Sequence, residues 1–275
     1  MLSLIIALVG GIVADIALQA IWNSPGWNAF FAVLVFLVIW VLINLRLNKR
    51  LEKIFKGVQE HISTAQEKVR REAQMWQQKG MGGPKLQERI EEKLKTAIRE
   101  ALTQLDAVEP LRRWNWLAGR QADTMKAQLL FQIRDYASAD PLLDKALMFD
   151  PAIVAMKMAR DYQRGNREKV EKAYKTGVRR FKGDKGIILY ALYSWILVKE
   201  NRIEEAVVVL DQGKLKTDSP VLKENWQHLV NGQVKQFSNA GLNELWYMLN
   251  LEEQKQMRIR QQPSPFGMPG GRHRR

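Results

Sequence analysis

The side chains that most often carry out chemistry are few and widely separated in this sequence. The three histidines, His61, His228 and His273, stand in unrelated contexts, and none has the neighbouring ligands or acid–base partner that metal sites and hydrolytic sites require. The sequence has no cysteine, which excludes disulfide bonds, thiolate zinc ligands and a cysteine nucleophile. We therefore expect no enzymatic activity, no metal site and no cofactor.

Glycines at positions 80–83 could suggest a phosphate-binding loop. They follow a helical pattern rather than a strand, and neither G-x-x-x-x-G-K-[ST] nor G-x-G-x-x-G occurs in the sequence. Together with Pro84, these glycines instead predict a break between two helices.

Basic side chains exceed acidic ones, and the formal charge of +14 suits a polyanionic partner, an anionic bilayer surface or simple solubility. Residues 167–182 contain seven basic and two acidic residues and are expected to form one exposed helix. Nucleic acid would bind such a stripe, although a solvated helix face is the more frequent explanation. The tail at 253–275 is rich in proline and glycine, ends in basic residues and is predicted to be disordered.

Apolar residues are concentrated in the first 45 positions, in two segments of membrane-spanning length. Residues 1–22 contain a single charge, Asp15, and residues 29–45 contain none. About 20 apolar residues suffice to cross the hydrocarbon core as a helix. The turn between the segments carries a Pro-Gly pair and is flanked by Trp22 and Trp27, whose indole rings favour the headgroup layer. We therefore predict a transmembrane helical hairpin in contact with membrane lipid.

The orientation of this hairpin follows from its flanking charges. Basic residues come directly after the second segment, at Arg46, Lys49 and Arg50, whereas the turn has none. By the positive-inside rule we expect residues 46–275 in the cytoplasm, and the absence of cysteine fits a bacterial inner-membrane protein. A cleavable signal peptide is the alternative, because residues 17–20 (ALQA) resemble a cleavage site. The missing positive n-region and the second segment directly downstream favour two retained helices.

Asp15 is the one ionisable residue within the predicted spans. A carboxylate there costs about 2.5–3.5 kcal/mol, so Asp15 is a candidate for contact with a partner subunit or for proton relay. The alternative is that it is protonated or wetted at the outer interface. Gly10, Gly11, Ala14 and Ala17 form a small-residue face, which we expect to pack the hairpin rather than to recognise a partner.

A charged stalk is predicted over residues 46–110. Apolar positions from Leu51 to Trp76 recur at spacings of three and four, close to the a/d alternation of a heptad. After the break, a second such seam runs from Leu86 to Leu105. The two seams either pack on each other or mediate homo-oligomeric coiled-coil pairing, and the sequence leaves both open.

Residues 120–153 resemble a tetratricopeptide repeat (TPR), in which two helices cross where side chains are small. The match consists of Ala127-x-x-Leu130, then Tyr136-x-x-Ala139-x-x-x-Leu143-x-x-Ala146, then Asp150-Pro151. The resemblance implies a second helix that extends through Ala146 and a proline that ends it. Weaker copies follow at 151–184 and 187–219, and a divergent helix pair at 220–252 suggests a cap. We predict an all-α protein with a TPR-like α-solenoid over 111–252.

In TPR proteins, the first helix of each repeat lines a concave groove that holds a peptide or a partner helix. The resemblance places six residues of this chain in such a groove: Gln128, Gln132, Tyr162, Gln163, Trp195 and Lys199. For Tyr162 and Trp195, completing the core is an equally good explanation.

Together these features predict a membrane-anchored adaptor that presents a protein-binding groove to the cytoplasm. Its layout is similar to that of HemY-type inner-membrane proteins. Two alternatives remain open. One is a structural subunit of a larger membrane complex, which would contact other spans through Asp15 and the small-residue face. The other, less favoured, is a membrane-tethered nucleic-acid binder that would use residues 167–182 and the tail.

Overall fold

The computed structural model describes residues 2–21 and 25–253. Within these residues the protein is all-α, with twelve α-helices and no strand. The N-terminal helices are α1 (Leu2–Ile21), α2 (Pro25–Gln78) and α3 (Pro84–Leu105). The remaining α-helices are α4 (Glu109–Arg112), α5 (Trp116–Gln132), α6 (Tyr136–Leu143), α7 (Pro151–Gln163), α8 (Arg167–Arg180), α9 (Ile187–Lys199), α10 (Ile203–Lys216), α11 (Pro220–Val230) and α12 (Glu244–Tyr247). Short 3-10 turns are η1 (Asp106–Val108), η2 (Gly183–Gly186), η3 (Val234–Gln236) and η4 (Ala240–Leu242).

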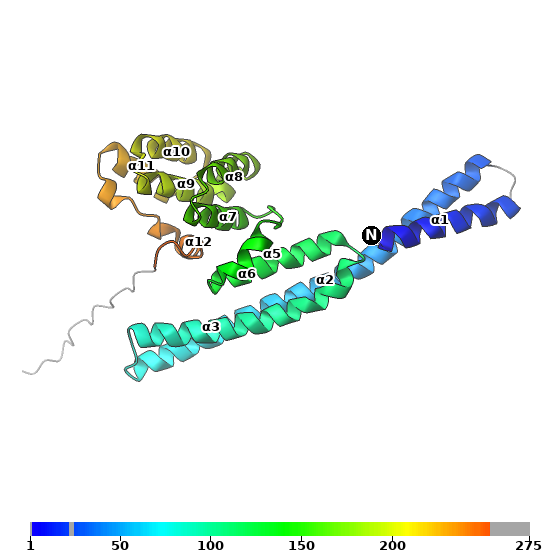
Figure 1. Cartoon of the computed structure of the whole chain (residues 1–275), viewed down its shortest axis with the longest axis horizontal. Helices are drawn as coiled ribbons and strands as arrows, with labels where there is room; N and C mark the ends of the chain where they lie inside the picture. The colour runs from blue at the N-terminus through cyan, green and yellow to red at the C-terminus, as the bar shows by residue number, and fades with distance from the viewer. Residues whose placement is uncertain (1, 22–24, 254–275) are drawn as a thin grey trace, which may run out of the picture.

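α1 and the first half of α2 form an antiparallel hairpin that projects from the rest of the molecule (Figure 1). Both helices are long and apolar enough to cross a membrane. Gly10 and Gly11 face α2, because a Cβ atom on Gly10 would lie 2.5 Å from the Ile39 side chain. A Cβ atom on Gly11 would lie 3.1 Å from that of Phe36. The small residues therefore pack the hairpin at these two positions, whereas Ala17 is exposed.

α2 continues without interruption from the apolar segment into the charged stalk, over 54 residues. α3 folds back along it after a turn in which Gly80 and Gly83 adopt φ angles of 81° and 66°. Apolar side chains of both helices are buried in the stalk: Leu51, Val58, Val69, Leu86, Ile98, Ala101 and Leu105. The two seams thus pack on each other within one chain, which is the first of the two arrangements that the sequence allows.

The base of the stalk is joined to the rest of the chain by a small apolar cluster. Leu47 and Leu51 of α2 pack against Val108 and Leu111, which lie in η1 and α4. Ala118 and Ala122 of α5 complete the cluster. Further along, Leu129 of α5 packs with Val58 and Leu105 of the stalk. α5 therefore lies against the stalk over most of its length.

From α5 onward the helices form successive pairs, α5 with α6, α7 with α8 and α9 with α10, followed by α11 (Figure 1). α5, α7, α9 and α11 end in the same way. In each, a residue with positive φ follows the helix: Arg134, Gly165, Asn201 and Gly232. In each, two backbone N–H groups bond back to the last turn, as Asp135 N does to Leu130 O at 3.0 Å and Gln233 N to His228 O at 2.8 Å. These bonds form a Schellman motif, which satisfies carbonyl groups at a helix end.

The second helix of the first pair differs from its expected extent. α6 ends at Leu143, so Ala146 lies beyond it, and Pro151 is the first residue of α7 rather than the end of α6. The Asp150 side chain caps α7 by accepting a hydrogen bond of 2.8 Å from Ala152 N. An aspartate cap followed by proline at the first helical position is a strong start signal, so these residues begin a helix instead of ending one.

Candidate partner-binding site

The structure brings three of the six inferred groove residues together on α7 and α9. Tyr162 packs edge-on against Trp195, with ring centroids 5.7 Å apart. Lys199 Nζ lies 5.2 Å from the centre of the Trp195 ring, within the range of a cation–π interaction. These residues form one continuous group of aromatic and basic side chains.

The three glutamines of the inferred groove do not join this aromatic group in the same way. The side-chain oxygen of Gln163 accepts a hydrogen bond from Arg160 on its own helix. Gln128 is half-buried and Gln132 is exposed, both on α5. Gln132 lines a separate cleft between the stalk and the helix pairs.

The aromatic group is covered by the chain's own C-terminal segment, residues 238–252, which we call the strap. After α11 the chain turns back toward α7 and α6 instead of forming another long helix (Figure 1). Asn239 is fully buried, and its side-chain N–H donates to Ala191 O of α9 at 2.9 Å. At the far end, the Asn250 side chain donates to Phe131 O of α5 at 3.0 Å. The strap therefore contacts α9 and α5, the first helices of two of the pairs, on the face where the sequence resemblance predicted a groove.

Glu252 fixes the strap over the aromatic group. One carboxylate oxygen accepts a hydrogen bond of 2.7 Å from Trp195 Nε1, and the other accepts one of 2.8 Å from Trp246 Nε1. The two indole rings meet edge-on, with centroids 5.7 Å apart. Trp195 is consequently only 7% exposed and Trp246 only 1%. Trp195 thus contributes to the core, which the sequence analysis gave as the alternative to a position in the groove.

Replacing Glu252 with alanine is expected to lower the free energy of unfolding by about 2–4 kcal/mol, because two buried indole N–H groups lose their acceptor. The isosteric change Glu252→Gln keeps one acceptor oxygen and directs an N–H toward the other indole, so we expect an intermediate loss. Chemical denaturation followed by tryptophan fluorescence measures both. The neighbouring Glu253→Gln serves as the control, and equal losses in Glu252→Gln and Glu253→Gln would contradict the clamp.

The joint between α6 and α7 is held by charge. Asp140 accepts two hydrogen bonds of 2.8 Å from the Arg160 guanidinium, and Arg164 pairs with the same carboxylate. The Arg160 guanidinium also stacks 4.0 Å from the centre of the Tyr136 ring. The hydrogen bonds from Arg160, with the further contact to Arg164, hold the pKa of Asp140 below its ordinary value of 3.8.

This lowered pKa predicts a defined dependence of stability on pH. Above pH 3.8 Asp140 is ionised in both states, and its pairing stabilises the fold in full. As the pH falls below 3.8, the unfolded state takes up the proton first, so this contribution is lost. We expect Asp140→Asn to cost about 1.5–3 kcal/mol at neutral pH and to flatten the acid limb of the stability curve. Urea unfolding at a series of pH values tests both, and an unchanged acid limb would contradict the assignment.

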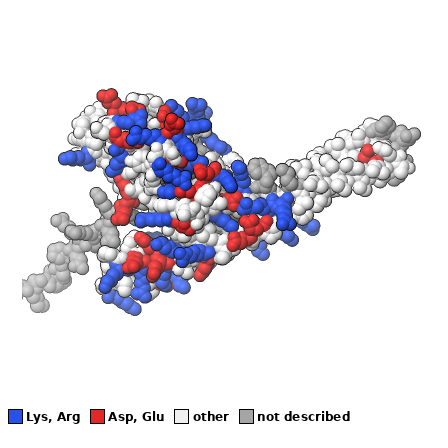
Figure 2. Space-filling view, viewed as in Figure 1, with Lys and Arg blue, Asp and Glu red and all other residues white. Residues whose placement is uncertain are grey.

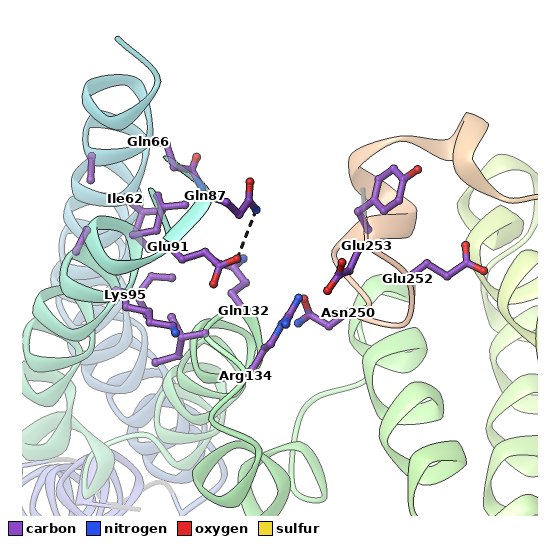
Figure 3. A pocket seen from close by; sticks show the side chains of 16 residues that line it. Ile62, Gln66, Gln87, Glu91, Lys95, Gln132, Arg134, Asn250, Glu252 and Glu253 are labelled. Carbon is purple, nitrogen blue, oxygen red and sulfur yellow. Dashed lines mark hydrogen bonds between the residues drawn. The ribbon is translucent and has the colours of Figure 1, made fainter. Parts of the chain in front are cut away.

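A cleft of about 640 Å³ lies between the stalk, the C-terminal end of α5 and the end of the strap (Figure 3). Glu91 and Lys95 of α3 line its stalk wall, and Gln132 and Arg134 line its floor. The end of the strap, including Asn250, Glu252 and Glu253, forms the opposite wall. Both basic side chains, Lys95 and Arg134, and acidic ones, Glu91 and Glu253, line this cleft.

His61, His228 and Asp15, which the sequence analysis singled out, each contact a polar or charged side chain of the same chain. His61 Nε2 lies 3.2 Å from Glu100 of α3, and His228 Nε2 lies 3.6 Å from Glu224 on its own helix. The Asp15 carboxylate accepts a hydrogen bond of 2.8 Å from Gln19, one turn along α1. Among the described residues, no group of three or more histidine, aspartate and glutamate side chains could hold a metal ion.

The described residues that the sequence analysis assigned to the membrane and its interface lie on or next to the apolar hairpin. Figure 2 shows a hairpin almost free of charged side chains and a body covered with both signs. Trp27 is 59% exposed near the turn of the hairpin, and Arg46, Lys49 and Arg50 are exposed where α2 leaves it. Trp22, His273 and residues 254–275 of the expected tail lie outside the described residues.

The strap differs from the helix pair that the sequence predicted over residues 220–252, because only α11 is a long helix there and α12 has four residues. Its turns contain Asn243 and Asn250 with φ angles of 51° and 53°, and asparagine is enriched in this left-handed region. Asn243 and Asn250, spaced among leucines around Trp246, were thus the available signal. No protein-family model, curated protein or solved structure matches this chain.

Proposed function

We propose that the protein is a membrane-anchored, TPR-like scaffold that recruits a protein partner at the bacterial inner membrane, with residues 46–275 in the cytoplasm. The observation that carries this proposal is the exposure of the apolar side chains of the α1–α2 hairpin. Only 17% of the most apolar window of α1 and 6% of that of α2 are buried within the protein. A core helix of a soluble protein would be covered, and soluble monomers rarely expose apolar patches of this size.

The packing of the hairpin supports retention of both helices. Gly10 and Gly11 fit against α2, and the start of α1 is bonded to residues 113–114 near the base of the stalk. A signal peptide that is removed after export has no need of such contacts.

The TPR-like assignment of the body is supported by its repeated helix ends and by its close helix crossings. A Cβ atom on Gly177 of α8 would lie 2.7 Å from the Leu189 side chain of α9. A Cβ atom on Gly213 of α10 would lie 3.0 Å from Leu222 of α11. Both glycines occupy the small positions that the repeat pattern assigns, and each faces the next helix along the chain.

The partner would bind in the cleft between the stalk and the helix pairs. The usual groove is filled by the strap, whereas the cleft is open and is lined by Gln132, one of the residues inferred from the repeats. The two alternative functions gain less support. Asp15 is paired within its own helix, and basic residues of α8 are partly neutralised, as in the pairs Lys175–Glu171 and Arg167–Glu200.

The anchor is tested by alkaline carbonate extraction of membranes that contain the full chain. We expect the protein to stay in the membrane pellet, and protease added to spheroplasts to leave the body intact. A protein released by carbonate would contradict the anchor.

The scaffold role is tested by affinity purification from gently solubilised membranes with quantitative mass spectrometry. The cleft variant Gln132→Glu/Arg134→Asn keeps a residue that tolerates the φ of 61° at position 134. We expect it to lower recovery of the partner about tenfold, equivalent to about 1.4 kcal/mol. The matched control Gln212→Glu/Lys216→Asn makes the same changes of charge at exposed positions of α10. Equal recovery with both variants would place the partner elsewhere.

A further inference from the structure

The short segment between the stalk and the helix pairs is attached to the very start of α1. Leu2 N donates to Arg113 O at 3.2 Å, and Ser3 Oγ donates to Trp114 O at 3.0 Å. Ser3 is only 5% exposed, so these bonds are shielded. They hold residues 113–114 at the level of the first turn of α1.

A second and independent attachment sets the same level on α2. Leu111 of α4 packs against Leu47 and Leu51, which follow the last apolar residues of the hairpin directly. The end of α4 is therefore fixed both to the first turn of α1 and to the first turns of α2 beyond its apolar segment. In a hairpin that spans the bilayer, these two places mark the same headgroup layer, since two antiparallel spans of similar length begin and end together.

Charge at this level has one dominant sign on α2. Arg46, Lys49, Arg50 and Lys53 are exposed, and Glu52 is the single acid between residues 46 and 59. α4 contributes differently, because Arg112 is paired with Asp123 and Glu109. A hollow of about 720 Å³ opens between the start of α1 and α4, lined by Leu2, Glu109, Pro110, Arg112, Arg113 and Trp114.

We propose that residues 109–114 rest on the inner headgroup layer and that Arg46, Lys49, Arg50 and Lys53 of α2 bind anionic phospholipid headgroups there. We call residues 109–114 together with these four cations the neck surface. Trp114 at this level matches the preference of indole rings for the headgroup region. Each cation near an anionic surface contributes about 1 kcal/mol, a factor of about five in affinity. The neck surface gives the body a contact with the membrane in addition to the two spans and so restricts the tilt of the stalk.

This inference rests on the proposed membrane anchor, so its test must separate the two. Because the chain has no cysteine, single cysteines can be introduced and labelled with an environment-sensitive fluorophore. The positions are Pro110 in the neck surface, Val38 in the middle of the α2 apolar segment and Lys79 at the far end of the stalk, all exposed. The labelled full-length protein is reconstituted into vesicles of equimolar phosphatidylcholine and phosphatidylglycerol.

Nitroxide lipids with the quencher at the headgroup or deep in the acyl chain then report the depth of each label. We expect headgroup nitroxides to quench the label at Pro110→Cys at least twofold more than the label at Lys79→Cys. We expect nitroxides deep in the acyl chain to quench the label at Val38→Cys. A Val38→Cys label that resists deep quenching overturns the anchor itself. A Val38→Cys label that is quenched, with Pro110→Cys no more quenched than Lys79→Cys, overturns the neck surface alone.

The lipid preference is tested by electron paramagnetic resonance of spin-labelled phosphatidylglycerol and phosphatidylcholine around the reconstituted protein. We expect a preference for phosphatidylglycerol that falls at least twofold in the variant Arg46→Gln/Lys49→Gln/Arg50→Gln/Lys53→Gln. The matched control removes four exposed cations from α8 and the residues directly after it, Lys169→Gln/Lys172→Gln/Arg179→Gln/Lys182→Gln, and is expected to keep the preference. An equal preference in both variants would overturn the assignment to the α2 cations.

Discussion

Replacing Trp246 with alanine is expected to lower the free energy of unfolding of the helix-pair body by about 3–5 kcal/mol, the usual cost of deleting a buried tryptophan. Trp246 is 1% exposed, packs edge-on against Trp195 and donates to Glu252. Its removal leaves a cavity between the strap and α9 and frees one oxygen of Glu252. Differential scanning fluorimetry and urea unfolding measure the loss.

The matched control for this variant is the adjacent Leu245→Ala, at a residue that is 37% exposed on the same short helix. We expect it to cost less than about 1 kcal/mol, because little apolar surface is returned to water. Hydrogen exchange distinguishes local from global effects: in Trp246→Ala the amides of the strap should exchange faster than those of α8. Equal stability of the two variants would mean that the strap does not contribute to the core.

Introducing a charge at Val58 is expected to separate the body from the stalk. Val58 is fully buried where α2 meets α3 and α5, against Leu105 and Leu129. A carboxylate at Val58→Asp would have to be buried without a partner, so we expect a loss of about 4 kcal/mol or more, typical of a buried unpaired charge. Limited proteolysis should then cleave between α3 and α5 at protease concentrations that leave the native protein intact.

Gln59→Asp provides the control for Val58→Asp. It introduces the same carboxylate into the same turn of α2, at an exposed position. We expect a change within about 0.5 kcal/mol and a native proteolysis pattern. Comparable cleavage in both variants would indicate a general weakening of α2 rather than loss of the contact with α3 and α5.

The apolar pattern of the sequence was sufficient to predict the all-α fold, the two apolar helices and the stalk. Spacings of three and four along α2 gave the buried face correctly at Leu51, Val58 and Val69. The same pattern could not predict which surface covers that face, because an apolar seam specifies its own geometry and not its partner. The structure shows α3 and α5 of the same chain against it.

The strap was beyond reach of the sequence for a different reason. Its position depends on side-chain hydrogen bonds to distant backbone, such as Asn239 to Ala191 O and Asn250 to Phe131 O. Such bonds join residues 48 and 119 positions apart and leave no periodic trace. For the same reason, Glu252 could not be recognised as the shared acceptor of Trp195 and Trp246. The error at α6 was local, since Asp150 and Pro151 were assigned to the end of α6 although they cap and begin α7.

Because α2 is one uninterrupted helix, a change in the tilt of its apolar segment moves the far end of the stalk. At 1.5 Å per residue its 54 residues extend for about 80 Å, and the part beyond residue 45 for about 50 Å. In a membrane-spanning α2, a change in tilt of about 10° would move the far end of the stalk sideways by roughly 9 Å. Changes in bilayer thickness would thereby become displacements of the cleft wall that α2 and α3 provide.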